Sequence, residues 1–476
     1  MSNILFLQNT ISELQGVMYL SRKLKDAGHH VHLLISGKKN RVLQYIDENN
    51  IGLVCFSLMY GHQFWATAIT RIIKAQKPEI KILWGGIFPT FNVDYLLEVG
   101  CVDAFCIGEG ENVIVPLVES VLADKKPETL KGVAYIQEGR IKENELCNYT
   151  DIENLIPDRD LYFGYSVLRK NPAKIFVASR GCIGSCSYCY NSKVKDLYKD
   201  NPNPYVRSRS PDSMLEEIQY VKNNYGLKRI FFYDDILIFN KTWAFEFLPR
   251  LKSKINAPYM CYTRPDLINE EITKLLKQTG CYMVSFGLES GNEELRMQVL
   301  NKRISNETII KAADIIKRNK LAFNTTNMMG FPHETYRMGL ETIELNIRIG
   351  AIGSCNILNP FPGTQLYEYC KNNNLFEENY FKQARTQIHY YPLIKNPDRN
   401  ALGNLERLFQ LAVFFPHTMY PLVKRIAKFR PNFFFDLIFL SLQFIYIKFF
   451  TERYSLKFML RYYSEKMKSV FGHQYN

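Results

Sequence analysis

The sequence predicts an α/β protein in three consecutive parts: a doubly wound N-terminal domain, a partial (β/α)6 barrel and a helical C-terminal region. Two series of short apolar runs, separated by amphipathic stretches of helical length, predict the first two parts. A change to basic and aromatic composition after about residue 376 predicts the third. We expect domain boundaries at 1–125, 126–172, 173–375 and 376–476, with the second segment as a linker.

The first series of strands predicts a Rossmann-like parallel sheet with helices on both faces. Helical patterns over 12–27, 62–76 and 111–123 separate its strands. The expected strands are residues 4–7, 31–35, 52–56, 82–84 and 104–107. The linker that follows is charged and weakly periodic, with a hairpin expected around Glu138-Gly139.

The second series begins at Lys174 and contains six βα units, which suit a partial or full parallel barrel. Such barrels place their chemistry at the C-terminal ends of the strands. The expected strands are residues 174–179, 229–234, 258–263, 281–288, 322–329 and 352–359.

Composition and charge indicate where the protein is located and which partners it could bind. The chain has 476 residues, eleven cysteines and a net charge of +13. The opening MSNILFLQNT lacks the pattern of a secretory signal, so we expect a reducing cytosol as its location. The positive charge admits nucleic acid, an acidic membrane surface or an anionic substrate as partner.

Three cysteines stand together directly after the first strand of the second series. They occur in Ser179-Arg-Gly-Cys182-Ile-Gly-Ser-Cys186-Ser-Tyr-Cys189, where Gly181 and Gly184 permit close backbone approach. Thiolates are preferred ligands of iron–sulfur clusters, and three of them leave one iron open. A zinc site and three unrelated buried cysteines remain alternatives, although structural zinc usually takes four ligands.

This motif, C-x3-C-x-Φ-C with Tyr188 as the aromatic residue, resembles the signature of the radical SAM superfamily. The resemblance covers about residues 172–375 and implies a [4Fe-4S] cluster on Cys182, Cys186 and Cys189. The open iron would chelate S-adenosylmethionine (SAM), and one electron would cleave SAM to a 5′-deoxyadenosyl radical. A flavodoxin or ferredoxin would supply that electron.

The resemblance also assigns SAM contacts to later strand ends. Asp234 would face the methionyl group, although the family's usual Gly-Gly-Glu is absent there. Arg264 would pair with the SAM carboxylate through a bidentate fork. Glu289 would contact the ribose or the amino group, and Gly330-Phe331 would form the adenine platform.

The N-terminal domain resembles the cobalamin-binding domain that precedes some radical SAM barrels. The residues that carry this resemblance follow strands three, four and five: Ser57, Gly85, Gly86, Gly108, Glu109 and Gly110. The loop of residues 8–16 lacks the histidine with which some of these domains bind cobalt. We therefore expect cobalamin without a histidine lower ligand; His62 is the nearest alternative, but its position indicates a helix start.

The C-terminal region is basic and aromatic. Residues 401–476 carry eleven Lys or Arg against four Asp or Glu, and nineteen Phe or Tyr. Residues 433–450 are apolar except for Asp436, Gln443 and Lys448. This pattern admits an interfacial membrane helix, a buried core helix or a membrane span, and an apolar run of this length argues against nucleic acid.

Together these features predict a cobalamin-dependent radical SAM enzyme that acts by methyl transfer on a hydrophobic small molecule, for which a lipid is one candidate. Radical cyclisation or carbon–carbon bond formation without methyl transfer is the first alternative. A non-enzymatic cobalamin or redox sensor is the second. The expected location is the cytoplasm, with peripheral contact to the inner face of an anionic membrane.

Overall fold

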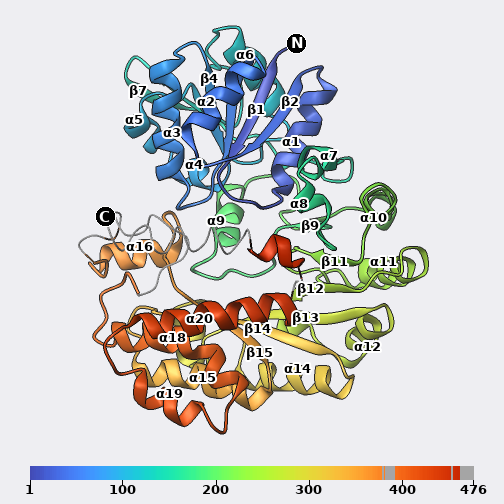
Figure 1. The fold of residues 1–476 in the computed structure, drawn as a ribbon, viewed down its shortest axis with the longest axis vertical. Coiled ribbons are helices and arrows are strands. Elements are labelled where there is room, and N and C mark those ends of the chain that lie inside the picture. The colour runs from blue at the N-terminus through green and yellow to red at the C-terminus, as the bar shows by residue number, and fades with distance from the viewer. Residues whose placement is uncertain (378–379, 381–391, 452–453, 461–476) are drawn as a thin grey trace. The chain divides into compact units, whose positions relative to one another are not determined.

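The computed structural model describes residues 1–377, 380, 392–451 and 454–460, and the chain divides into two compact units (Figure 1). Unit 1 contains Met1–Arg169 and Asp196–Tyr205. Unit 2 contains Lys170–Lys195 and the described residues from Val206 onward.

Unit 1 is built on one sheet with the strand order β2-β1-β3-β4-β5-β6-β7, in which the first five strands are parallel. From β1 the chain first adds β2 on one side and then β3 on the other, so the order of strands reverses between β1 and β3. Open parallel sheets bind ligands at such a reversal, beyond the carboxyl ends of their strands. The strands are β1 (Asn3–Gln8), β2 (His30–Ile35), β3 (Ile51–Ser57), β4 (Lys81–Gly85), β5 (Ala104–Cys106), β6 (Val133–Gln137) and β7 (Arg140–Glu143).

Helices α1 to α8 connect and follow these strands. β1 and β3 are mostly buried, as central strands covered on both faces should be. The helices are α1 (Gln15–Asp26), α2 (Lys39–Glu48), α3 (Gln63–Gln76), α4 (Ile87–Phe91), α5 (Tyr95–Val99), α6 (Ile114–Leu122), α7 (Arg159–Phe163) and α8 (Ser166–Arg169).

The predicted linker, residues 126–172, needs correction. The hairpin lies at the expected turn, with both Glu138 and Gly139 at positive φ. Its two strands, β6 and β7, extend the sheet of unit 1 by antiparallel pairing. The sequence did not indicate that β6 joins this sheet, because its partner β5 is distant in the sequence and the segment itself is only weakly periodic.

Unit 2 is an open sheet of six parallel strands in the order β15-β14-β13-β12-β11-β8. The six strands coincide with the six expected from the sequence. They are β8 (Ala173–Phe176), β11 (Arg229–Phe232), β12 (Tyr259–Thr263), β13 (Cys281–Glu289), β14 (Ala322–Met329) and β15 (Ile352–Ile357). A separate short antiparallel pair joins β9 (Ser179–Arg180) to β10 (Arg207–Ser208).

Side-chain caps define where most of the intervening helices begin, because each cap satisfies an orphan amide of the first turn. The capping residues are Ser210, Asn240, Asn269, Asn292, Ser305, Thr335 and Thr364. The helices are α9 (Tyr190–Leu197), α10 (Pro211–Tyr225), α11 (Lys241–Lys254), η1 (Pro265–Leu267), α12 (Glu270–Gln278), α13 (Glu293–Gln298), α14 (Asn306–Arg318), α15 (Tyr336–Ile349) and α16 (Gln365–Asn372).

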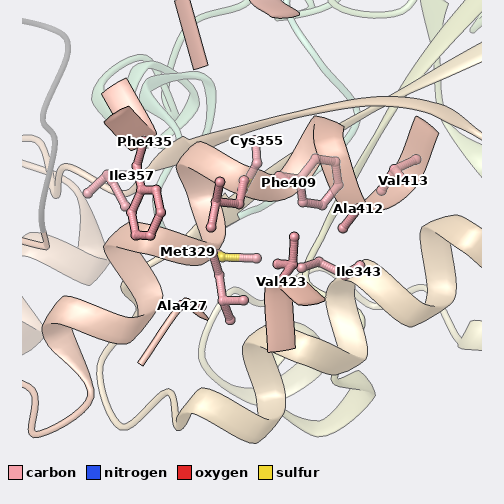
Figure 2. Packing of buried hydrophobic residues seen from close by; sticks show 12 residues of the cluster. Met329, Ile343, Cys355, Ile357, Phe409, Ala412, Val413, Val423, Ala427 and Phe435 are labelled. Atoms are coloured by element: carbon pink, nitrogen blue, oxygen red, sulfur yellow. The ribbon is translucent and has the colours of Figure 1, made fainter. Parts of the chain in front are cut away.

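The C-terminal helices share a core with the barrel, so they do not form a domain of their own within the described residues. Phe409 and Val413 of one helix meet Met329, Cys355 and Ile343 of the barrel in a single buried cluster (Figure 2). These helices lie beside β14, β15 and α15 (Figure 1). They are α18 (Arg399–Phe414), α19 (Tyr420–Ile426), α20 (Phe433–Ile445) and the π-helix η2 (Tyr446–Phe450).

Candidate cluster and cofactor sites

The cysteine loop follows the carboxyl end of β8 and is only partly buried at all three cysteines. Gly181 turns the chain with a φ of +90°. The Gly184 amide donates to Cys182 Sγ over 3.3 Å. A Cβ on Gly184 would lie 3.4 Å from Cys182 Sγ and 3.8 Å from Cys186 Sγ. Glycine at 184 therefore leaves room between two sulfur atoms.

The end of α13 and the first turn of α16, both in unit 2, hold the cysteine loop at Ser187. The Ser187 amide donates to Leu300 O over 2.9 Å, and its hydroxyl donates to Val299 O over 2.6 Å. From the opposite direction, the Leu366 amide donates to Ser187 O over 2.9 Å. The loop is thus preorganised by neutral hydrogen bonds that leave the sulfur atoms available.

The residues present fit an iron–sulfur cluster better than a single ion. Among the described residues, no three His, Cys, Asp or Glu side chains gather closely enough to hold one metal ion. A four-iron cluster instead gives each cysteine an iron of its own, which spreads the ligands. Burial raises the pKa of the Cys182 thiol, and raises that of Cys189 to about 12, so iron must displace a proton from each sulfur.

Arg264 lies beside the cysteine loop, as expected, but its fork is already engaged. Its Nε and Nη2 donate to the two carboxylate oxygens of Asp266 over 3.0 and 2.8 Å. A Cβ on Gly184 would lie 2.9 Å from Arg264 Nη1. Bidentate pairing of Arg264 with SAM would use this same fork in place of Asp266 and stays a prediction, while the Nη1 edge already lies beside the cysteine loop.

Asp234 and its neighbour Asp235 have different surroundings. The fully buried Asp234 carboxylate accepts from the Ala178 amide over 3.0 Å and from the Ser179 hydroxyl over 2.5 Å. Burial raises its pKa to about 6. Asp234 thus fixes the chain that enters the cysteine loop, and its predicted contact with SAM stays a prediction.

Asp235 is the functional candidate that sequence reasoning missed. The residue reaches solvent, but burial of part of its side chain raises the pKa of Asp235, and a hydrogen bond with Asn191 acts in the opposite direction. Its charge raises the pKa of Cys182 and of Cys189, which places it near both sulfur atoms. In the sequence, only the adjacent pair Asp234-Asp235 pointed to this site. The sequence does not show which of the two side chains turns towards solvent.

Glu289 lies at the end of β13 in a left-handed backbone conformation, with a φ of +67°. Its Oε1 accepts from Lys302 Nζ over 2.8 Å in a buried ion pair. The buried Tyr188 hydroxyl faces the same carboxylate; burial first, and then the Glu289 charge, raise the pKa of Tyr188 well above its usual range. A Cβ on Gly287 would lie 1.9 Å from Glu289 Oε1, so glycine there makes room for the pair.

Gly330 and Phe331 follow β14, but the Phe331 ring is fully buried in a core cluster. The adenine platform expected at Gly330-Phe331 stays a prediction, and the buried ring leaves the backbone of these residues to form it. Both backbone amides donate to Glu334 Oε2, over 2.5 and 3.0 Å. Burial raises the pKa of Glu334 to about 8, so this carboxyl is protonated at neutral pH and holds the loop through one oxygen.

In unit 1, Ser57, Gly85 and Gly86 come together at the ends of β3 and β4. The Leu58 amide donates to Gly85 O over 2.7 Å. Gly86 has a φ of +96°, and a Cβ there would lie 2.8 Å from Leu58 O. Only glycine fits this approach, which keeps the backbone low at the strand edge where a nucleotide tail would lie.

Gly108, Glu109 and Gly110 follow β5, where residues from two other segments contact them. The Glu109 amide donates to the Tyr198 hydroxyl over 3.0 Å, and Tyr198 stacks on Tyr149 with ring centres 4.2 Å apart. A Cβ on Gly108 would lie 2.1 Å from that hydroxyl. Tyr198 directly follows α9, the helix after the cysteine loop, but it belongs to unit 1. No sequence pattern indicated its contact with Glu109.

His62 begins α3, as its position indicated. The Ala66 amide donates to its carbonyl over 3.0 Å, and burial lowers the pKa of its ring. In the loop of residues 8–16, Gln8 Nε2 donates to Thr10 O and Ser12 O over 2.7 and 3.0 Å. The side-chain amide of Gln8 therefore holds the first part of the loop of residues 8–16 in place.

Comparison with known proteins matches both units. Residues 12–118 match the B12 binding domain, and residues 176–345 match the radical SAM superfamily. An uncharacterized methyltransferase of Pyrococcus horikoshii is 27% identical over 348 residues, 70% of this chain and 72% of that protein. An anaerobic magnesium-protoporphyrin IX monomethyl ester cyclase of Cereibacter sphaeroides is 23% identical over 380 residues, 74% of this chain and 59% of that protein.

Two solved structures share the architecture. The cobalamin-dependent SAM radical enzyme OxsB, with aqua-cobalamin and SAM bound, matches with a TM-score of 0.69 and 13% identity over 100% of this chain and 76% of OxsB. The radical SAM methyltransferase TsrM of Kitasatospora setae, with cobalamin and a [4Fe-4S] cluster, matches with a TM-score of 0.64 and 16% identity over 78% of this chain and 75% of TsrM. These findings confirm the predicted fold class and the three predicted cofactors: a [4Fe-4S] cluster, SAM and cobalamin.

Proposed function

We propose, from the premise that this chain belongs to the radical SAM superfamily and carries a B12 binding domain, that it methylates an unactivated carbon of a hydrophobic small molecule. One observation carries the proposal: a cysteine loop at the end of a parallel barrel and a glycine-lined cobalamin edge occur in one chain. A sensor would need only the second of these.

The chain's own residues bind and orient the cofactors. Cys182, Cys186 and Cys189 hold the cluster, while Arg264 and Asp235 supply opposite charges beside it for the zwitterionic end of SAM. Glu289, set by Lys302, accepts a hydrogen bond from SAM. When bound, the cluster provides the electron that splits SAM, and cobalamin provides the methyl group.

The interior of the barrel supports a hydrophobic substrate. Phe231, Met260 and Met283 lie at paired positions of β11, β12 and β13 and form one buried cluster. Tyr233 and Tyr262 extend this apolar face, with ring centres 6.0 Å apart. An aromatic and thioether wall favours an apolar substrate over a polar one.

The test is a reconstituted anaerobic assay with extract from a deletion strain and SAM labelled in its methyl group. Methyl transfer requires labelled product together with 5′-deoxyadenosine and S-adenosylhomocysteine. Release of 5′-deoxyadenosine with an unlabelled product would favour cyclisation instead, the reaction named for the cyclase relative. Absence of 5′-deoxyadenosine would contradict both reactions.

We propose further that cobalt has no histidine below it. Loop 8–16 contains no histidine, and His62 is committed to the start of α3. Electron paramagnetic resonance of the Co(II) protein should show no nitrogen splitting from a protein imidazole. Splitting that disappears in His62→Ala would contradict this assignment.

A further inference from the structure

The outward side of α20 and η2 is apolar apart from Ser441. Phe434 is 72% exposed, Leu437 50% and Phe449 60%. Exposed residues recur about every fourth position, which places them on one face of the helix. They are Phe433, Phe434, Leu437, Ser441, Ile445 and Phe449, and we call them the outer stripe.

The three polar interruptions of this helix all face the protein. Asp436 accepts from Nε of the buried Arg407 over 2.5 Å. Gln443 is buried, and Lys448 Nζ donates to Tyr454 O over 2.9 Å. The three polar breaks seen in the sequence therefore turn inward, and the outer stripe is apolar except for Ser441.

Four basic residues directly precede the outer stripe in the sequence, and no acidic residue stands between them and its first Phe. Lys424, Arg425, Lys428 and Arg430 are exposed on α19 and the turn that follows it. Asp436 is the only acidic residue between Arg407 and Thr451, and Arg407 neutralises it. The surface that results is apolar and positively charged, which matches the composition of an interfacial membrane helix.

The same contacts argue against a membrane span. Among the described residues one helix, Phe433–Phe450, is long and apolar enough to cross a membrane, and 28% of it is buried. Its inner face is fixed by the Tyr446 hydroxyl, which donates to Asn324 Oδ1 over 2.5 Å, and by Phe435 and Phe439 in the core. Spanning would pull these groups out of the barrel and expose the buried Arg407.

We propose that the outer stripe and its four basic neighbours dock the protein on the surface of an anionic lipid bilayer, with α20 in the plane of the interface. Lipid fits both parts of the surface: acyl chains accept the exposed Phe and Leu side chains, and anionic headgroups attract Lys and Arg. A second copy of the chain would bring four like charges against four.

The experiment is sedimentation of the reconstituted full-length protein with vesicles of phosphatidylcholine alone or mixed with phosphatidylglycerol. Binding should occur on the mixed vesicles at low salt and weaken as salt rises. Arg425→Glu with Arg430→Glu should lower the affinity at least tenfold, because each nearby basic residue contributes roughly a fivefold gain. Lys252→Glu with Lys254→Glu on α11 carries the same charge change and should have no effect.

Phe434→Ser with Leu437→Ser tests the apolar part and should also lower binding at least tenfold without loss of iron or of SAM cleavage. The proposal is overturned if the wild-type protein stays in the supernatant with anionic vesicles at low salt. Equal binding to neutral vesicles would also overturn it. So would sedimentation without lipid that shows an oligomer dissolved by the serine substitutions, because the stripe would then be an interface between copies.

Discussion

At the scale of single residues, Lys302 has the largest predicted effect on stability. It is the ion-pair partner of Glu289, and both side chains are about one-tenth exposed or less. Lys302→Met leaves a buried carboxylate without its cation, which costs about 3–5 kcal/mol. Urea unfolding of the reconstituted protein measures this loss. Arg318→Met, which breaks an exposed pair with Glu270, is the control and should cost about 1 kcal/mol or less.

Glu334 predicts a pH dependence of stability. Its pKa rises from 4.5 to about 8 because burial disfavours the charge. The folded state therefore holds the proton more tightly than the unfolded state, so stability is highest below the ordinary pKa and falls as pH rises towards 8. Glu334→Gln keeps the neutral shape and removes this loss. Between about pH 5.5 and 9 the wild type should lose on the order of 3 kcal/mol relative to the variant.

Thermal unfolding of both proteins across that range tests the prediction. A constant difference between wild type and variant at every pH would contradict it, because it would mean that Glu334 does not change its protonation. The Gly330 and Phe331 amides keep an oxygen acceptor in the variant, so loss of the loop itself is not expected.

Some residues of the candidate sites could be predicted from the sequence and others could not. The three cysteines could be found from spacing alone, since their chemistry depends on neighbours within one loop. Asp234 and Asp235 could not be told apart, because the choice depends on β8 lying beside β11. That pairing brings the Ala178 amide to Asp234 and leaves Asp235 outside. Tyr198 was missed for the same reason: its partner Glu109 is 89 residues away.

At the scale of elements, the turn after β4 should be sensitive to any side chain. Gly86→Ala would hold alanine in a positive-φ conformation that essentially only glycine adopts, which costs about 1–3 kcal/mol, and would press Cβ against the Leu58 backbone. We expect a loss of stability and about tenfold or more weaker binding of hydroxocobalamin, followed by its absorbance change. Gly139→Ala is the matched control: its φ is +72°, but nothing lies within 4 Å. Equal effects of the two substitutions would show that strain alone, and not the close approach, matters.

Elements were predicted well where the pattern was local. All six barrel strands could be placed because each is a short apolar run bounded by a capped helix. The region of residues 126–172 and α20 were harder, because their environment is set by distant partners. β6 joins the sheet through β5, and the inward turn of Asp436 depends on Arg407, 29 residues earlier.

At the scale of the whole molecule, each candidate cofactor site is built from residues of one unit. The cysteine loop, its supports at Val299 and Leu366, and the Glu289 pair all belong to unit 2. The cobalamin edge, including Tyr198, belongs to unit 1. The segment Asp196–Tyr205 is the one described part that leaves the sequence of unit 2 to join the other unit.

This division predicts that the two cofactors can be lost separately. Replacing Cys182, Cys186 and Cys189 together by Ala should abolish iron binding and SAM cleavage, because three ligands leave no spare. Hydroxocobalamin should still bind in equal amount, since the residues expected at its edge belong to unit 1 and the cysteine loop belongs to unit 2. Conversely, Gly86→Ala should keep its iron and its release of 5′-deoxyadenosine while it loses cobalamin. Iron analysis and cobalamin absorbance on the same samples decide the matter. Loss of cobalamin together with iron in the cysteine variant would contradict this prediction. It would mean that the cobalamin site folds only when the cysteine loop is ordered. The segment Asp196–Tyr205 would then connect the two sites, because its Tyr198 contacts Glu109.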